Sequence, residues 1–154
     1  MKHQSDILAL KYRPTDFKDL IGQEYLVETI QKSIELNKIP NAYIFTGIRG
    51  VGKTTTARIV AKMLNCTAFD QNNRPDLNNC DQAKAISEDR HPDVIEIDAA
   101  SNTSVENARE IIENVKYNPV LGKYKVYIID EVHMLSKSAF NALLKTLEEP
   151  PPHS

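Results

Sequence analysis

The chain has 154 residues, with 19 Lys and Arg against 21 Asp and Glu, a formal net charge of −2 at pH 7. Hydrophobic residues make up 41% and charged residues 26%, which is typical of a globular domain and excludes a disordered chain. The near-neutral charge excludes the simplest kind of basic, autonomous nucleic-acid binder. No apolar run can span a bilayer and the two cysteines make no disulfide framework, so we expect a cytoplasmic protein with no membrane partner.

The N-terminal half predicts an irregular arm followed by a helix, a strand and a second helix. Residues 1–22 mix charges with Pro14 and predict the arm. Apolar residues at helical spacing predict a helix over about 23–37. The β-forming run 42–46 predicts a strand that Gly47 ends, and a helix over 53–65 follows.

The second half predicts strands that alternate with helices. Polar residues 66–92 predict an inserted loop with at most one short helix, near 81–88. Strands are predicted over 94–98, which alternates, and over 126–129, which is almost continuously apolar. Thr103 and Glu106 fit a capping box that starts a helix reaching Val115, and Ser136 can cap a last helix reaching Leu147. The order predicts an α/β fold with a mostly parallel sheet.

A phosphate-binding loop lies between the first predicted strand and the helix after it. Residues 47–54 match G-x-x-x-x-G-K-[ST] in full. Glycines let successive N–H groups point at phosphate oxygens, the lysine reaches the β- and γ-phosphates, and the threonine hydroxyl can hold Mg²⁺. The residues predicted to bind nucleotide here are Gly47, Arg49, Gly50, Val51, Gly52, Lys53, Thr54 and Thr55.

A second candidate motif is the pair of acids that ends the strand over 126–129. Carboxylates at the carboxyl edge of a parallel sheet lie beside such a phosphate loop. Asp130 is the candidate to hold Mg²⁺ together with Thr54, and Glu131 is the candidate general base for an attacking water. His133 either tunes this site or makes a structural hydrogen bond in its loop.

Longer motifs surround these two sites. They are Leu10-Lys-Tyr-Arg-Pro14 with Phe17 and Asp19–Gln23, Ile95–Asn102, and the run from Asp130 to Pro150. With them, nearly the whole chain resembles the N-terminal part of bacterial DNA polymerase III gamma/tau subunits, the AAA+ ATPases of the sliding-clamp loader. The chain also resembles, less closely, the Holliday-junction branch-migration ATPase.

The resemblance implies a P-loop NTPase of the AAA+ type, with a three-layer α/β/α arrangement, that uses ATP and Mg²⁺. It implies that Tyr12, Arg13, Pro14 and Ile21 pack on the adenine and ribose, and that Lys53 and Glu131 are catalytic. It also places residues 101–109 where the assembled ring lines DNA, so that Asn102 or Arg109 could contact phosphates. Residues 101–104 are equally explained as capping residues.

The insertion departs from the family pattern. The family carries a four-cysteine zinc module here, and residues 66–92 resemble a degenerate copy that keeps Cys66 and Cys80. Asp76, Asp81 or His91 could complete a mixed site only in an unusual ligand set. We therefore expect no zinc.

The chain also departs from the family in length. We expect residues 1–154 to be a partial AAA+ nucleotide-binding domain that lacks the sensor-1 strand, the arginine finger and the lid. By resemblance, sensor-1 lies between the phosphate-loop strand and the strand before Asp130, so the facing edges of those two strands would be unpaired. An arginine finger in trans contributes roughly 10³- to 10⁵-fold. We therefore expect near-background turnover from this chain alone.

The function predicted is the ATP-binding and hydrolysing portion of a clamp loader, which loads the sliding clamp on primed DNA during replication. Its partners would be the other clamp loader subunits in a hetero-oligomer, the clamp, and DNA through the assembled complex. Two alternatives stay open. One is a non-catalytic P-loop scaffold, and the other is a branch-migration motor, which the run from Phe140 to Pro150 fits less well.

Overall fold

The computed structural model describes residues 24–47 and 52–154. The elements are α2 (Glu24–Glu35), α3 (Lys53–Asn65), η2 (Leu77–Asn79), α4 (Asp81–Ser87), β1 (Val94–Asp98), α5 (Val105–Val115), β2 (Val126–Asp130), η3 (Val132–Met134) and α6 (Lys137–Glu148). Apart from the strand over 42–46, the predicted helices and strands therefore form within a few residues of their expected bounds. None of the helices in the described ranges has the length and apolar character needed to cross a membrane.

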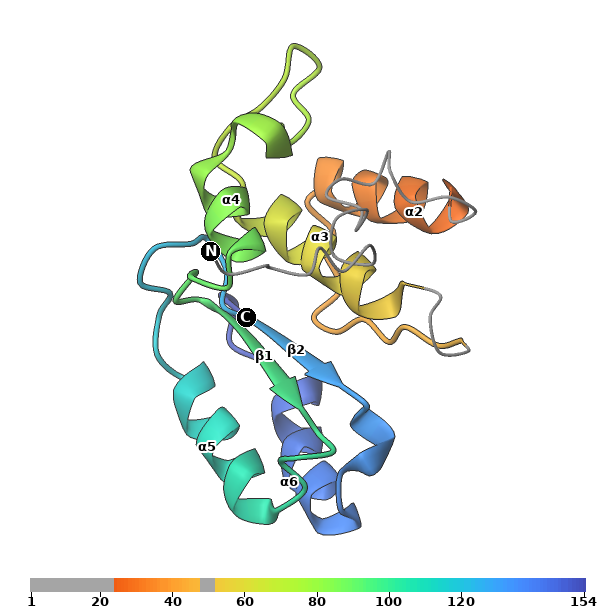
Figure 1. The fold of residues 1–154 in the computed structure, drawn as a ribbon, viewed down its shortest axis with the longest axis vertical. Coiled ribbons are helices and arrows are strands. Elements are labelled where there is room, and N and C mark those ends of the chain that lie inside the picture. Colours follow the sequence, from red (N-terminus) through yellow and green to blue (C-terminus); the bar gives the residue numbers. More distant parts are fainter. Residues whose placement is uncertain (1–23, 48–51) are drawn as a thin grey trace, which may run out of the picture.

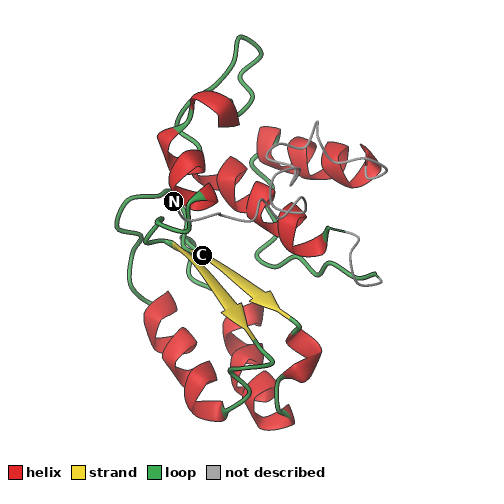
Figure 2. Cartoon of the chain, in the orientation of Figure 1, coloured by secondary structure: helices red, strands yellow, loops and turns green. Residues whose placement is uncertain are grey.

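Two parallel strands form the sheet (Figure 2). β1 pairs with β2 in a register that runs from Val94 opposite Val126 to Asp98 opposite Asp130. Because α5 lies between them in the chain, β1, α5 and β2 make one crossover unit, as the alternation predicted. The register brings the aspartates that end the two strands to the same edge of the sheet.

Helices cover both faces of this sheet (Figure 1). On one face, Ile129 of β2 packs against a cluster that α5 and α6 form around Ala108, Ala139 and Leu143. The next residue along the strand alternates to the other face, where Ile128 is buried opposite α3 and α4. The α/β class is confirmed, with a sheet of two strands in the described residues.

The strand predicted over 42–46 is wrong. This segment has no regular secondary structure and lies outside the described sheet. The Tyr43 and Phe45 rings stack with centroids 6.3 Å apart and pack against the cluster around Ile30 and Ile59, while Ile44 is 83% exposed. β propensity alone does not make a strand, because the backbone must also find a neighbouring edge to pair with. Here no described strand presents one to it.

The helix caps refine two predictions. Ser136 caps α6 as expected, because its hydroxyl accepts the N–H of Ala139 at 3.1 Å. The cap of α5 is Ser104 instead of Thr103, since the Ser104 hydroxyl accepts the N–H of Asn107. The carbonyl of Thr103 instead accepts the N–H of Ser136 at 3.2 Å, which ties the starts of α5 and α6 together.

The insertion packs onto α3 as a continuation of the core. Cys66, Leu77, Cys80 and Ala83 are buried in one cluster with residues of α2 and α3. Residues 69–75 form a turn that carries an isolated antiparallel bridge between Phe69 and Pro75. The insertion therefore has apolar packing of its own, which a loop of purely solvated residues would lack.

Candidate functional site

The first turn of α3 carries the lysine and threonine of the phosphate-loop motif. Gly52 caps the helix with φ +83°, a left-handed conformation that glycine adopts most readily. The Lys53 ammonium donates to the backbone carbonyl of Gly47 at 2.8 Å, from one end of the loop to the other. Thr55 lies in the same turn and is buried.

The two candidate motifs meet at one contact. The Thr54 hydroxyl donates to Oδ2 of Asp130 at 3.0 Å, across 76 positions of sequence. One residue begins α3 and the other ends β2. A hydroxyl and a carboxylate are oxygen ligands of the kind that Mg²⁺ prefers, so this pair fits the predicted metal. Because these two oxygen ligands lie together beside the phosphate-loop lysine, we treat this part of the fold as a candidate site for Mg²⁺ and nucleotide.

Glu131 follows Asp130 in a strained backbone conformation. Its φ of 54° and ψ of 42° are left-handed, which costs a non-glycine residue about 1 kcal/mol or more. Its N–H donates to Oδ1 of Asp130 at 3.1 Å, and its carboxylate lies 3.3 Å from Nε2 of His133. His133 thus contacts the predicted base directly, and both the tuning role and the structural bond stay predictions.

The end of β1 forms a compact polar turn at the same edge of the sheet. The Asp98 carboxylate accepts the N–H of Ala100 at 2.9 Å and the hydroxyl of Ser101 at 3.0 Å. The Asn102 side chain donates to the backbone carbonyl of Asp98 at 2.9 Å. Asn102 therefore stabilises this turn, whereas Arg109 is exposed on α5. Their predicted contacts with DNA stay predictions.

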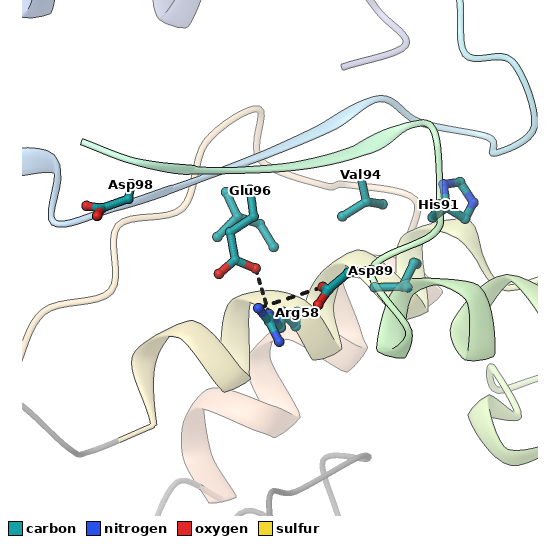
Figure 3. Close-up of a pocket in the computed structure, with 8 residues that line it drawn as sticks. Arg58, Asp89, His91, Val94, Glu96 and Asp98 are labelled. Carbon is teal, nitrogen blue, oxygen red and sulfur yellow. Dashed lines mark hydrogen bonds and ion pairs between the residues drawn. The ribbon is translucent and has the colours of Figure 1, made fainter. Parts of the chain in front are cut away.

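Arg58 is a residue that the sequence analysis missed. Its Nε donates to Oε2 of Glu96 on β1 at 2.7 Å, and its Nη2 lies 3.8 Å from Asp89 (Figure 3). These side chains line a cavity of about 420 Å³ between α3, α4 and the sheet. Two spacings in the sequence could have pointed to this pair. Arg58 lies four positions after Thr54, on the same face of a helix, and Glu96 lies two positions before Asp98, on the same face of a strand.

Asp93 is a second residue that the motifs did not reveal. It is fully buried, and its carboxylate accepts N–H groups of Val120, Leu121 and Gly122 at 2.6, 2.7 and 2.6 Å. Burial by itself would raise the pKa of Asp93, but these three donors, with the nearby charge of His91, lower it. Asp93 thereby anchors the loop that leads into β2.

The two cysteines face each other inside the insertion. Burial and the neighbouring Cys80 thiol raise the pKa of Cys66 to about 12, and the Cys66 thiol also donates to the carbonyl of Ala68 at 3.1 Å. Among the described residues, no three His, Cys, Asp or Glu side chains gather into a metal-binding group. Asp76, Asp81 and His91 thus do not complete a mixed site, and the absence of zinc stays a prediction for metal analysis.

Part of the predicted site lies outside the described residues. These positions are Tyr12, Arg13, Pro14 and Ile21 of the arm, and Arg49, Gly50 and Val51 of the phosphate loop. The described part of the site is therefore Gly47, the first turn of α3 and the end of β2.

Comparison with known proteins identifies the family. A family model described as "DNA polymerase III, delta subunit" matches residues 22–154. The chain belongs to this family. The matched range includes both candidate motifs and all of the described residues.

Named relatives confirm the resemblance to gamma/tau subunits. The chain is 52% identical over 145 residues to "DNA polymerase III subunit tau/gamma" of Haemophilus influenzae, covering 94% of this chain and 21% of that protein. It is 50% identical over 147 residues to "DNA polymerase III subunit tau" of Escherichia coli, covering 96% and 23%. It is 52% identical over 147 residues to "DNA polymerase III subunit gamma" of Buchnera aphidicola subsp. Schizaphis graminum, covering 96% and 40%. The chain thus spans between a fifth and two fifths of the length of these relatives.

Proposed function

We propose that this chain is the ATP-binding and ATP-hydrolysing portion of a clamp loader subunit that acts in DNA replication. The observation that carries the proposal is the 3.0 Å contact between Thr54 and Asp130. Two separate sequence motifs predict these residues as Mg²⁺ ligands, and in the fold the two side chains are in contact. The names of the relatives support a role in replication, since each is a subunit of DNA polymerase III.

The roles of the site residues follow from their chemistry. Lys53 would leave the Gly47 carbonyl and bind the β- and γ-phosphates as a cation. Thr54 and Asp130 would hold Mg²⁺, which neutralises charge on the phosphates when bound. Glu131, beyond the end of β2, would orient and polarise the attacking water. The contact with His133 uses Oε2 of Glu131 and leaves Oε1 of the same carboxylate for that water.

The partners proposed are those of a clamp loader. They are the other clamp loader subunits in a hetero-oligomer, the sliding clamp, and primed DNA bound by the assembled complex. The place of action proposed is the cytoplasm. A non-catalytic scaffold that keeps the P-loop fold is the competing outcome, and binding measurements separate the two.

The test is calorimetric titration of Mg²⁺-ATP into the 154-residue chain, after a near-UV spectrum has established fixed packing. Lys53→Ala is expected to weaken binding by about tenfold or more, because a hydrogen bond to a charged group contributes about 1.5–3 kcal/mol. The matched control is Lys84→Ala, which removes an exposed lysine from α4.

Lysine-dependent binding would support the clamp loader proposal. Equal binding by wild type and Lys53→Ala would contradict it, because the nucleotide would then bind elsewhere. No binding by a well-packed chain would favour the scaffold. No binding by a poorly packed chain would move the same titration to a longer protein.

A further inference from the structure

Two polar contacts join α3 to the sheet, one to each strand. Thr54 and Arg58 are four positions apart and lie on the same face of the helix. Thr54 bonds to Asp130 at the end of β2, and Arg58 bonds to Glu96 in the middle of β1. Figure 3 shows Arg58 below the sheet, with Glu96 and Asp89 pointing toward it.

The spacing of these contacts matches on both elements. Four residues of helix rise about 6 Å. On the sheet, Glu96 pairs in register with Ile128, two residues before Asp130, and two residues of strand rise about 6.6 Å. The two contacts therefore engage at the same time in this position of the helix along the sheet. A shift of α3 along the sheet would move Thr54, whose side chain is short, away from Asp130.

The Arg58–Glu96 pair is more enclosed than the surface ion pairs of this chain. Its side chains are 21% and 32% exposed, whereas those of the Lys116–Glu113 pair on α5 are 59% and 67% exposed. An enclosed pair with a 2.7 Å hydrogen bond is screened less by solvent and holds a defined geometry. Asp89, two residues after α4 ends, lies 3.8 Å from Nη2 of the same guanidinium.

We propose that Arg58 and Glu96 are positioning residues, which hold α3 on the sheet so that Thr54 faces Asp130 and the Mg²⁺ ligands are preorganised. This inference rests on the proposed function. Neither residue contacts the nucleotide in this scheme. Loss of either residue should lower the gain in nucleotide affinity that Mg²⁺ provides. It should leave the affinity of the phosphate loop for metal-free nucleotide unchanged.

The test compares nucleotide affinity in Mg²⁺ with affinity in EDTA, using ADP and ATP. Glu96→Gln is expected to reduce the gain from Mg²⁺ by about fivefold, the upper end for a partly exposed ion pair. The affinity of Glu96→Gln for nucleotide in EDTA should stay within about twofold of the wild-type affinity, a difference of less than about half a kcal/mol. The matched control is Glu113→Gln, which makes the same change in the exposed pair on α5.

A double-mutant cycle adds a second readout. Arg58→Gln should reduce the Mg²⁺ gain to the same extent, and the double variant should lose no more than either single variant. Equal loss in Mg²⁺ and EDTA would overturn the proposal, because the pair would then serve only the packing of α3. An unchanged Mg²⁺ gain would overturn it too.

A wild-type chain that binds no nucleotide would contradict the proposed function but not decide this inference. Amide hydrogen exchange of the first two turns of α3 tests, without nucleotide, whether the pair holds the helix at all. Faster exchange there is expected in Glu96→Gln than in Glu113→Gln. Equal exchange in the two variants overturns the inference, because the pair then does not hold α3 on the sheet.

Discussion

Replacement of Asp93 by asparagine tests how the loop before β2 is held. The Asp93 carboxylate is fully buried and accepts three backbone N–H groups at 2.6–2.7 Å. Asp93→Asn removes the charge and turns an NH₂ group toward at least one of these donors. The N–H groups of Val120, Leu121 and Gly122 then lack a full set of acceptors at a side chain that has no exposed surface.

The expected loss is about 3 kcal/mol in the free energy of unfolding. A hydrogen bond to a charged group contributes about 1.5–3 kcal/mol, and a buried donor left unpaired costs about 1–3 kcal/mol. The gain from not burying the carboxylate charge offsets part of this loss. Against a typical domain stability of about 5–15 kcal/mol, the change is large enough to measure with certainty.

The assay is urea unfolding followed by far-UV circular dichroism at pH 7. Asp70→Asn is the matched control, because the Asp70 carboxylate also accepts two N–H groups, of Asn72 and Arg74, but is exposed. The control should lose less than about 1 kcal/mol, since water replaces the lost acceptor. Equal losses in the two variants would refute the argument that burial makes the Asp93 contacts strong.

The same carboxylate sets a pH dependence. Burial favours the neutral form of Asp93, but the backbone donors and His91 outweigh it and lower its pKa in the folded state. Its contribution is therefore present above the unfolded pKa of about 3.9 and is lost as the pH falls through the lower folded pKa. Asp93→Asn should remove this part of the acid unfolding profile. An unchanged profile would count against it.

Three further predictions concern the surroundings of this anchor and the cysteines. Gly122→Ala should destabilise the chain by about 1–3 kcal/mol in urea unfolding, because a Cβ there would lie 2.7 Å from Oδ1 of Asn65. Burial lowers the pKa of His91, so its titration midpoint by NMR should lie below the usual value of about 6.5. The free energy of unfolding should therefore fall as the pH drops below about 6.5. A midpoint above that value would contradict this prediction. Metal analysis should find no zinc, and about one zinc per chain would contradict this prediction.

Local sequence patterns were enough to predict most elements and the residues at the centre of the candidate site. The helical periods of α3 and α5 and the apolar run of β2 are properties of short windows, so their bounds could be predicted within a few residues. The phosphate-loop motif and the acids after β2 also have fixed spacing to the elements that carry them. Lys53, Thr54 and Asp130 could therefore be assigned before their geometry was known.

The tertiary structure decided what depends on partners distant in the chain. The segment 42–46 has the composition of a strand, but no described edge pairs with it. Glu96 becomes the partner of Arg58 only because α3 and β1 lie side by side, and Asp93 becomes an anchor only because residues 120–122 fold over it. A carboxylate in sequence has no assigned partner, since register and packing choose it among many. The sequence thus determined which residue types the candidate site contains, and the fold determined which side chains lie next to them.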